Sequence, residues 1–307
     1  MKTNEVQPMS KPQAIDKFQL ITDKLIGLIE RGVKPWTKSW HATPYQNLIT
    51  GHQYTGINPI LCGIDSTINQ WEHPFFASFI QAKQVGWTVK NGSKSTWLRW
   101  GGTNVKETEN PETGEVELLY YKAFKFHNVF NVACIDDSNS DVKIDSLIRQ
   151  RKVTISGNSE LRLPEVEQFI RQHLPKTQFG GNVAIYHIAT DTIRLPEYET
   201  FSNAVAYYAT YLHELVHWTG HQKRCNRPLN NKFGSWSYAF EELIAEIGAA
   251  MVCNHLGIDS KLEHHASYLD VWLKILKDDK KAFFDAARLA IGATQYLTAV
   301  QQLEKAS

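Results

Sequence analysis

The chain has 307 residues, and its 33 Lys and Arg nearly balance its 32 Asp and Glu, which leaves a net charge of +1 at pH 7. Hydrophobic residues make up 42% of the chain and charged residues 21%, which excludes an intrinsically disordered protein. The near-neutral charge excludes a general electrostatic attraction to nucleic acid, so a basic surface requires local segregation of charge.

The first 18 residues are polar and lack the apolar core of a secretory signal peptide. No apolar run approaches the roughly 20 residues that a membrane span needs. The four cysteines form no C-x-x-C pair and are typical of small buried side chains in a reducing compartment. These features predict a cytoplasmic protein that makes no membrane contact.

Two helices are predicted in the first quarter of the chain. Apolar residues recur at spacings of three and four from Phe18 to Leu28, which predicts an amphipathic helix over residues 14–31, ended by Gly32. A second helix is predicted over residues 75–85.

Residues 85–135 alternate between apolar and polar side chains, which predicts a small antiparallel sheet. Asn91-Gly92 is a strong hairpin signal between two such runs, and residues 110–114 supply a second turn.

The acidic segment 136–141 contains no apolar residue and is therefore the best candidate for a linker. It divides the chain into a sheet-rich domain over residues 1–136, a linker over 137–142 and a helix-rich domain over 143–307. Both halves are predicted to be of the α+β class.

In the second half, two short runs are predicted to form paired strands, and helices follow from residue 202 to the end. Ser202 or Asn203 would cap the first of these long helices, and Ser237 the second. The predicted strands cover 183–188 and 191–196, a helix and a strand are predicted within 144–155, and the other predicted helices cover 164–174, 202–219, 237–257, 268–277 and 281–302.

The first long helix contains an H-E-x-x-H motif, formed by His213, Glu214 and His217. Residues four apart share one helix face, so the two histidines can bind one zinc ion. Glu214 lies beside this site, where it can accept a proton from a water molecule at the metal. The alternative is a surface helix that happens to carry two histidines, but the flanking residues are apolar nearly all round and predict a buried helix.

A catalytic zinc site usually has three protein ligands, so a third ligand must lie downstream. Lys223 occupies the position where the metzincin pattern requires a histidine. The next helix offers Glu242 and Glu246, four residues apart on one face. The two acids could have either role, or both could face solvent. Two histidines and one carboxylate also accept manganese.

A peptidase also needs a donor for the oxyanion that forms during peptide hydrolysis. Tyr238, His264, His265 and Tyr268 are the candidates, and the sequence does not choose among them.

The N-terminal half interleaves basic and aromatic residues, as a single-strand DNA groove requires. The segment from Lys83 to Trp100 contains four basic residues and no acidic one. The alternative is that the rings belong to the core and the lysines to a solvated sheet face. The residues predicted from this pattern to contact DNA are Trp36, Lys38, Trp40, Lys90, Lys94, Trp97, Arg99, Trp100, Lys122 and Lys125.

The chain resembles the ArdC antirestriction family of conjugative plasmids, whose N-terminal domain also resembles that of TraC-type primases. The resemblance rests on motifs that occur in order along nearly the whole chain. They are Pro35-Trp36, the segment Tyr54 to Pro59, Gly86 to Trp100, Phe130-Asn131, Asp191 to Pro196, His213 to His221 and Tyr238 to Glu246.

This resemblance implies an N-terminal domain that binds single-stranded DNA and a C-terminal zincin metallopeptidase-like domain. It implies a protein that protects incoming plasmid DNA from host restriction during conjugation, and it adds Tyr54 and Asn58 to the predicted DNA contacts. The helix with Glu242 also resembles that of gluzincins, which implies that Glu242 is the third ligand and that Glu246 orients a ligand histidine.

Three functions follow as hypotheses. In the first, the chain binds single-stranded DNA and is a zinc peptidase whose substrate is a host protein. In the second, it binds single-stranded DNA and its metal site is not catalytic. In the third, it is a zinc peptidase whose N-terminal half recognises protein.

Overall fold

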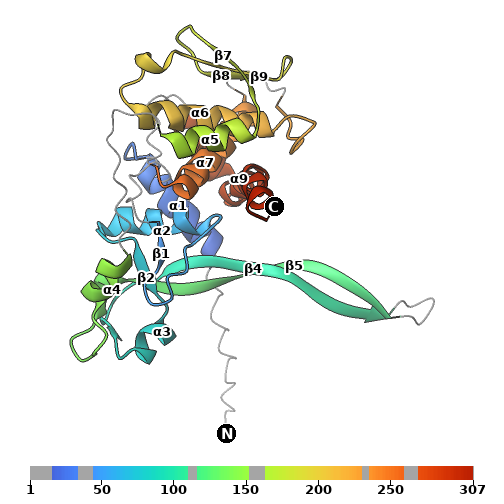
Figure 1. Ribbon diagram of the computed structural model, residues 1–307. Helices are drawn as coiled ribbons and strands as arrows, with labels where there is room; N and C mark the ends of the chain where they lie inside the picture. The colour runs from blue at the N-terminus through green and yellow to red at the C-terminus, as the bar shows by residue number, and fades with distance from the viewer. Residues whose placement is uncertain are drawn as a thin grey trace.

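The computed structural model describes residues 16–33, 44–109, 116–151, 163–229, 235–258 and 269–306. It is a mixed helix and sheet structure in which the sheet-rich N-terminal half and the helix-rich C-terminal half lie against each other (Figure 1). This confirms the predicted α+β class. None of the described helices is long and apolar enough to cross a membrane.

The N-terminal half is built around a four-stranded sheet with the order β1-β2-β5-β4. Strands β1 and β2 are parallel, and the other neighbours are antiparallel. The elements of this half are α1 (Lys17–Ile29), β1 (Gln46–Asn47), α2 (Asn58–Asn69), β2 (Phe75–Ala77), α3 (Phe79–Gln84), β3 (Thr88–Val89), β4 (Thr96–Glu109), β5 (Val116–Asn131), β6 (Ile135–Asp136) and α4 (Ile144–Arg151).

Strands β4 and β5 form a long two-stranded arm that extends away from the rest of the molecule (Figure 1). All 14 residues of β4 pair with β5, from Thr96 opposite Val129 to Glu109 opposite Val116. The predicted turn at residues 110–114 lies outside the described residues.

The hairpin predicted at Asn91-Gly92 is wrong, because β3 does not pair with β4. It pairs instead with β6, with Val89 opposite Ile135. The run before the turn forms only the two-residue β3, whereas β4 and β5 offer a long series of cross-strand pairs, each of which stabilises the sheet.

The helix predicted over 75–85 is also partly wrong. Its first three residues form the buried strand β2, and α3 begins only after Ser78. Ser78 and Gln81 form a capping box, a local signal that sets the start of this helix.

The C-terminal half contains a three-stranded sheet with the order β7-β9-β8 above a group of helices (Figure 1). The predicted strand pair is confirmed as β8 and β9, whereas the polar strand β7 was not predicted. The elements are α5 (Pro164–Gln172), β7 (Lys176–Phe179), β8 (Ile185–His187), β9 (Thr192–Leu195), α6 (Ala204–Thr219), α7 (Trp236–Leu256), α8 (Leu269–Asp278) and α9 (Ala282–Ala306).

The caps of the long helices follow local chemistry. Asn203 caps α6, as predicted, and accepts a hydrogen bond from the backbone of Ala206. The cap of α7 is Ser235 and not Ser237, because the hydroxyl of Ser235 accepts from the backbone N–H of Tyr238.

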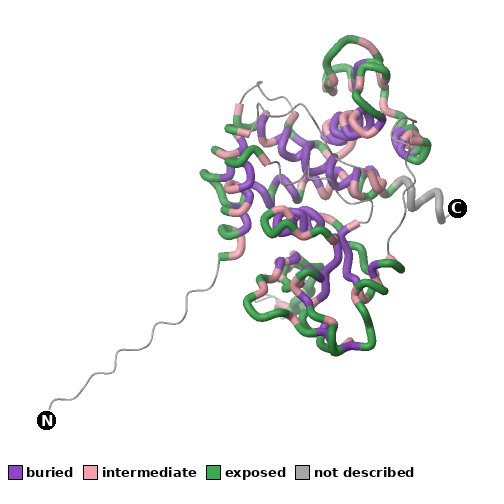
Figure 2. The backbone as a smooth tube through the Cα atoms, turned by 90° about the vertical axis from the view of Figure 1, so that its left-hand side faces the viewer, coloured by how far each residue is buried: buried purple, intermediate pink, exposed green. Residues whose placement is uncertain are grey.

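The largest hydrophobic cluster draws on both halves of the chain, and buried residues concentrate in the helices that meet there (Figure 2). Leu25 and Leu28 of α1 belong to the same cluster as Ile247 of α7, Trp272 of α8 and Phe283 of α9. Helix α1 and the C-terminal helices are therefore held by one shared core.

The predicted linker packs against α3 and β3. Ser140 is buried and donates to the carbonyl of Val85, and the indole N–H of Trp87 donates to the carbonyl of Val142 at 2.6 Å. The predicted domain boundaries stay a prediction.

Candidate metal centre

Helices α6 and α7 position the candidate metal ligands. Helix α6 is buried for most of its length, as its apolar sequence predicts, and His213 and His217 lie one turn apart on it. Helix α7 approaches α6 closely at Gly248, where an added Cβ would lie 2.8 Å from Val216 Cγ1. A larger residue at position 248 would therefore keep the two helices apart.

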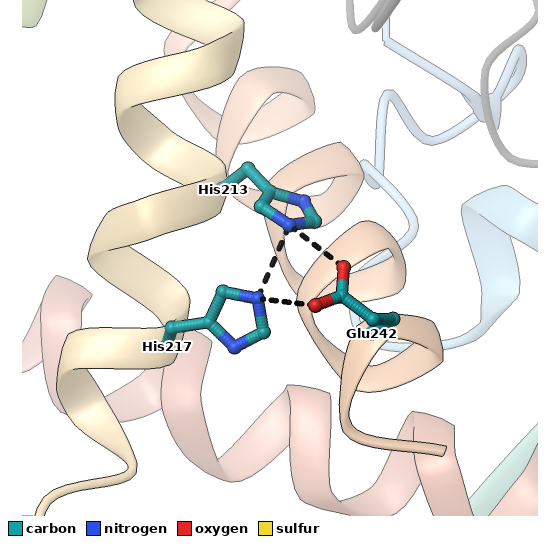
Figure 3. A group of neighbouring side chains, drawn as sticks. All are labelled: His213, His217 and Glu242. Atoms are coloured by element: carbon teal, nitrogen blue, oxygen red, sulfur yellow. Dashed lines mark hydrogen bonds and ion pairs between the residues drawn. The ribbon is translucent and has the colours of Figure 1, made fainter. Parts of the chain in front are cut away.

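This approach brings His213, His217 and Glu242 together (Figure 3). The Nε2 atoms of the two histidines are 3.2 Å apart, and they lie 3.4 and 3.6 Å from the carboxylate oxygens of Glu242. Ligand atoms arranged tetrahedrally at about 2.0–2.1 Å from zinc are about 3.3 Å from one another. The donor types and spacings therefore fit one divalent metal ion.

The ionisation of these groups reflects their burial. Burial by itself would raise the pKa of Glu242, but His217 and His213 outweigh this effect and hold that pKa well below its ordinary value. Burial raises the pKa of Glu214, and the two histidines oppose that rise. The site therefore contains two carboxylates in different environments.

Glu214 is buried beside strand β8, where the backbone N–H of Tyr186 faces its carboxylate and opposes the rise in its pKa. Within the described sheet, β8 is an edge strand, since its one neighbour is β9. Glu214 is therefore placed between the metal ligands and the open edge of a sheet.

A second carboxylate contacts His217 from the side away from the metal ligands. His217 Nδ1 lies 3.2 Å from Oε1 of Glu241, and Arg227 donates to both oxygens of Glu241 at 2.7 and 3.0 Å. Glu241 was not predicted as a site residue, although two adjacent acids in an otherwise apolar helix are themselves a signal that one of them is paired inside the protein.

Glu246 lies one turn beyond Glu242 on α7 and is only 1% exposed. Its assigned role of orienting a histidine stays a prediction. Of the four candidate oxyanion donors, Tyr238 is half-buried at the start of α7, and the other three lie outside the described residues.

The segment after α6 braces the strands near Glu214. Arg224 pairs with Asp191, and its guanidinium lies 3.7 Å from the ring centre of Trp218. Tyr186 also donates to Asp191, at 2.8 Å. These contacts tie β8 and β9 to the end of the metal-site helix.

The residues predicted to contact DNA fall into three groups. Trp36, Lys38 and Trp40 lie outside the described residues. Tyr54 and Asn58 are buried, and Asn58 accepts a hydrogen bond from the backbone of Arg99 at 2.7 Å. The Asn58 side chain therefore joins α2 to β4 inside the protein, and contact of Tyr54 and Asn58 with DNA stays a prediction.

The third group lies on or near the arm. Lys90, Lys94 and Lys125 are exposed, and Trp100 is 50% exposed opposite Lys125. Trp97 is half-buried near Lys17 and Lys24 of α1, and Arg99 stacks on Phe124 at 4.0 Å. Lys122 lies in β5 opposite Thr103. The exposed rings of Tyr121 and Phe124 were not predicted as DNA contacts, although both lie in the alternating pattern of β5.

Two known domain families match successive parts of the chain. Residues 16–130 match the profile of the N-terminal domain of anti-restriction factor ArdC. Residues 164–289 match the profile of a zincin-like metallopeptidase.

Two DNA primases named TraC from Escherichia coli are 32% and 30% identical to this chain over 92% of its length. The chain spans only 20% and 27% of those primases. An uncharacterized protein of Sinorhizobium fredii, y4eC, is 26% identical, with 93% of this chain and 92% of that protein covered.

The fold also matches crystal structures of antirestriction protein ArdC from plasmid R388. The metal-free structure is 32% identical, with a TM-score of 0.73, and the match covers 94% of this chain and 99% of that one. A Mn(II)-bound structure of the same protein matches with a TM-score of 0.72 at 31% identity, covering 93% of this chain and 98% of that one. Since the match spans both halves and nearly the full length of ArdC, this chain belongs to the ArdC antirestriction family.

Proposed function

We propose that this protein is a plasmid antirestriction protein that binds single-stranded DNA through its N-terminal half and hydrolyses a peptide bond at the metal centre of its C-terminal half. The observation that carries the proposal is the geometry of His213, His217 and Glu242, with Glu214 beside them and next to an open strand edge. In this role it protects incoming plasmid DNA from host restriction during conjugation.

In the proposed reaction, His213, His217 and Glu242 would hold a zinc ion, which would supply Lewis acidity and lower the pKa of a water molecule. Glu214 accepts the proton that the attacking water loses and passes it to the leaving nitrogen. The peptide lies extended along the open edge of β8, a common way for a strand edge to bind peptides.

The choice of zinc rests on the donor set, since two imidazoles and one carboxylate are typical of catalytic zinc. The same set accepts manganese, and the ArdC structure from plasmid R388 contains Mn(II). Metal analysis of protein purified without added metal tests this choice, and manganese as the dominant ion would contradict it.

Support for DNA binding comes from the arm. Trp100 and Tyr121 expose rings on one face of the β4–β5 ribbon, and Lys125 lies opposite Trp100 on that face. Exposed rings can stack on bases without sequence preference, and the lysines contact phosphates. The ArdC domain profile and the TraC primases likewise point to DNA as the partner.

The test of the catalytic part is Glu214→Gln, which keeps the size of the side chain but removes its ability to accept a proton. We expect this variant to keep its zinc and its single-stranded DNA affinity and to lose cleavage of a general protein substrate. The matched control is Glu199→Gln on the surface, which we expect to cleave like wild type. Equal cleavage by wild type and Glu214→Gln would contradict the proposed mechanism.

The test of the DNA part is fluorescence polarisation with one labelled oligonucleotide, single- or double-stranded, over a salt series. We expect a preference for the single strand and an affinity that falls steeply with salt. Binding that does not change with salt, or no binding, would contradict the DNA part and leave a peptidase with a protein-recognition half.

A further inference from the structure

The segment after α6 contains two arginines that reach different parts of the protein. Arg224 pairs with Asp191, at the turn between β8 and β9. Arg227 reaches inward to Glu241 on α7, in the position next to the predicted ligand Glu242. The two ion pairs can therefore be compared, because Arg227–Glu241 contacts a metal-site histidine and Arg224–Asp191 does not.

Arg227 is held on all sides. It is only 6% exposed, and its guanidinium donates to the Thr219 hydroxyl at 2.9 Å, to the Val216 carbonyl at 2.8 Å and to both oxygens of Glu241. A planar guanidinium with this many partners has a fixed position. Glu241 therefore cannot shift without breaking several hydrogen bonds.

Glu241 is also buried, at 7% exposed, and a buried carboxylate is stable only when it is paired. Its partners are Arg227 on one side and His217 Nδ1 on the other. When Nδ1 donates to this carboxylate, the lone pair of neutral His217 is on Nε2. Nε2 is the atom that lies 3.2 Å from His213 and 3.6 Å from Glu242.

We propose that Arg227 and Glu241 are positioning residues for the metal centre, which together fix the ring orientation and tautomer of His217. The inference rests on the proposed metal ligands and goes beyond them. It makes the metal affinity depend on a segment that contains no ligand. Residues that orient ligand histidines in this way typically change metal affinity by about 10- to 100-fold.

The test is the zinc affinity of folded variants, measured by competition with a chromophoric chelator. We expect Glu241→Ala and Arg227→Met to weaken zinc binding by about 10- to 100-fold. Glu241→Gln keeps an oxygen that accepts from Nδ1, so we expect it to recover part of the loss. Arg224→Met is the matched control, since it also removes a paired arginine from the same segment, and its partner Asp191 contacts none of the proposed ligands, so we expect its zinc affinity to stay close to that of wild type.

A double-mutant cycle tests whether the two residues act together. If Arg227 acts through Glu241, the Arg227→Met substitution weakens zinc binding much less in the Glu241→Ala background than in the wild-type background. Unchanged affinity in Glu241→Ala, or equal losses in Arg224→Met and Arg227→Met, would overturn the proposal. Absence of zinc binding by the wild type would instead overturn the proposed metal centre itself.

The zinc-loaded wild type gives a second readout that does not depend on any variant folding. A histidine Nδ1–H that donates to a buried carboxylate is protected from exchange and gives a proton resonance far downfield. We expect such a resonance for His217 by NMR, and its absence would contradict the proposed contact with Glu241.

Discussion

At the scale of single residues, the metal centre depends on a glycine that lets two helices approach as well as on the residues that bind the metal. Gly248 lies where α7 crosses α6, and a Cβ there would press on Val216. Gly292, on α9, has no atom within 4 Å of the corresponding position. The two glycines lie in neighbouring helices and differ in the space around them.

We expect Gly248→Ala to destabilise the protein by about 1–3 kcal/mol, because overpacking strains a filled core, and to weaken metal binding by separating the helices. Gly292→Ala should be neutral or stabilising by up to about 1 kcal/mol, because alanine favours helix and meets no neighbour. Urea unfolding of both variants tests this, and equal effects would contradict the explanation. Val216→Ala should recover part of the loss in Gly248→Ala.

His173 predicts a dependence of stability on pH. Burial lowers the pKa of this histidine to about 4, so the folded protein binds its proton less readily than the unfolded chain, whose histidine has a pKa near 6.5. The contribution of neutral His173 to the stability of the folded protein is therefore complete above pH 6.5 and is lost as the pH falls toward 4. We expect wild type to lose about 1–2 kcal/mol more stability than His173→Gln between pH 7 and pH 5, measured by denaturant unfolding. The same loss in both proteins would contradict this assignment.

The sequence predicted that His213 and His217 share one helix face, because they are four residues apart, and the resemblance to gluzincins implied Glu242 on the next helix. It did not predict Glu241, because adjacent helical residues point in different directions and their partners come from tertiary structure. Arg227 reaches Glu241 only after the chain turns at the end of α6.

At the scale of elements, the β4–β5 arm is the feature that distinguishes the N-terminal half. Alternation in the sequence predicted an antiparallel sheet, and this is confirmed, but it did not predict which strands pair. Local turn chemistry favoured Asn91-Gly92, and the longer runs 96–109 and 116–131 formed the hairpin instead. Pairing over many residues outweighs one favourable turn.

The exposed rings on the arm predict where single-stranded DNA stacks. We expect Trp100→Ala to weaken single-stranded DNA binding by about 1–3 kcal/mol, because a stacked ring contributes about that amount. Val105→Thr is the control, since Val105 is also exposed on the arm but has no ring. Fluorescence polarisation measures both, and similar losses in the two variants would show that the arm acts through its shape and not through stacking.

At the scale of the whole molecule, α1 belongs to the N-terminal half of the sequence but packs on helices of the C-terminal half. Thr22 of α1 donates to the carbonyl of Lys280, and ion pairs join Lys277 to Glu30 and Lys280 to Asp16. The periodicity of residues 14–31 predicted a helix with one apolar face. It could not identify the partner of that face, because any apolar surface of suitable shape would satisfy the pattern.

This shared core predicts that a defect in α1 reaches the C-terminal helices. Leu25 is fully buried, and we expect Leu25→Ala to cost about 2–5 kcal/mol and to speed hydrogen exchange in α8 and α9 as well as in α1. Ile148→Ala, in the separate cluster beneath α4, should speed exchange near α4 and leave α8 unchanged. Exchange confined to α1 in Leu25→Ala would show that the halves unfold independently.

The β4–β5 arm also bears on how copies of this protein avoid aggregation. Beyond the short contact of β5 with β2, no other described strand pairs with the ribbon, which carries exposed apolar side chains such as Val116 and Leu118. An open strand edge is a template for strand addition and aggregation. The sequence between residues 107 and 117 contains five glutamates, a density of like charge that repels a second arm. These glutamates thus disfavour the pairing of one arm with the edge of another.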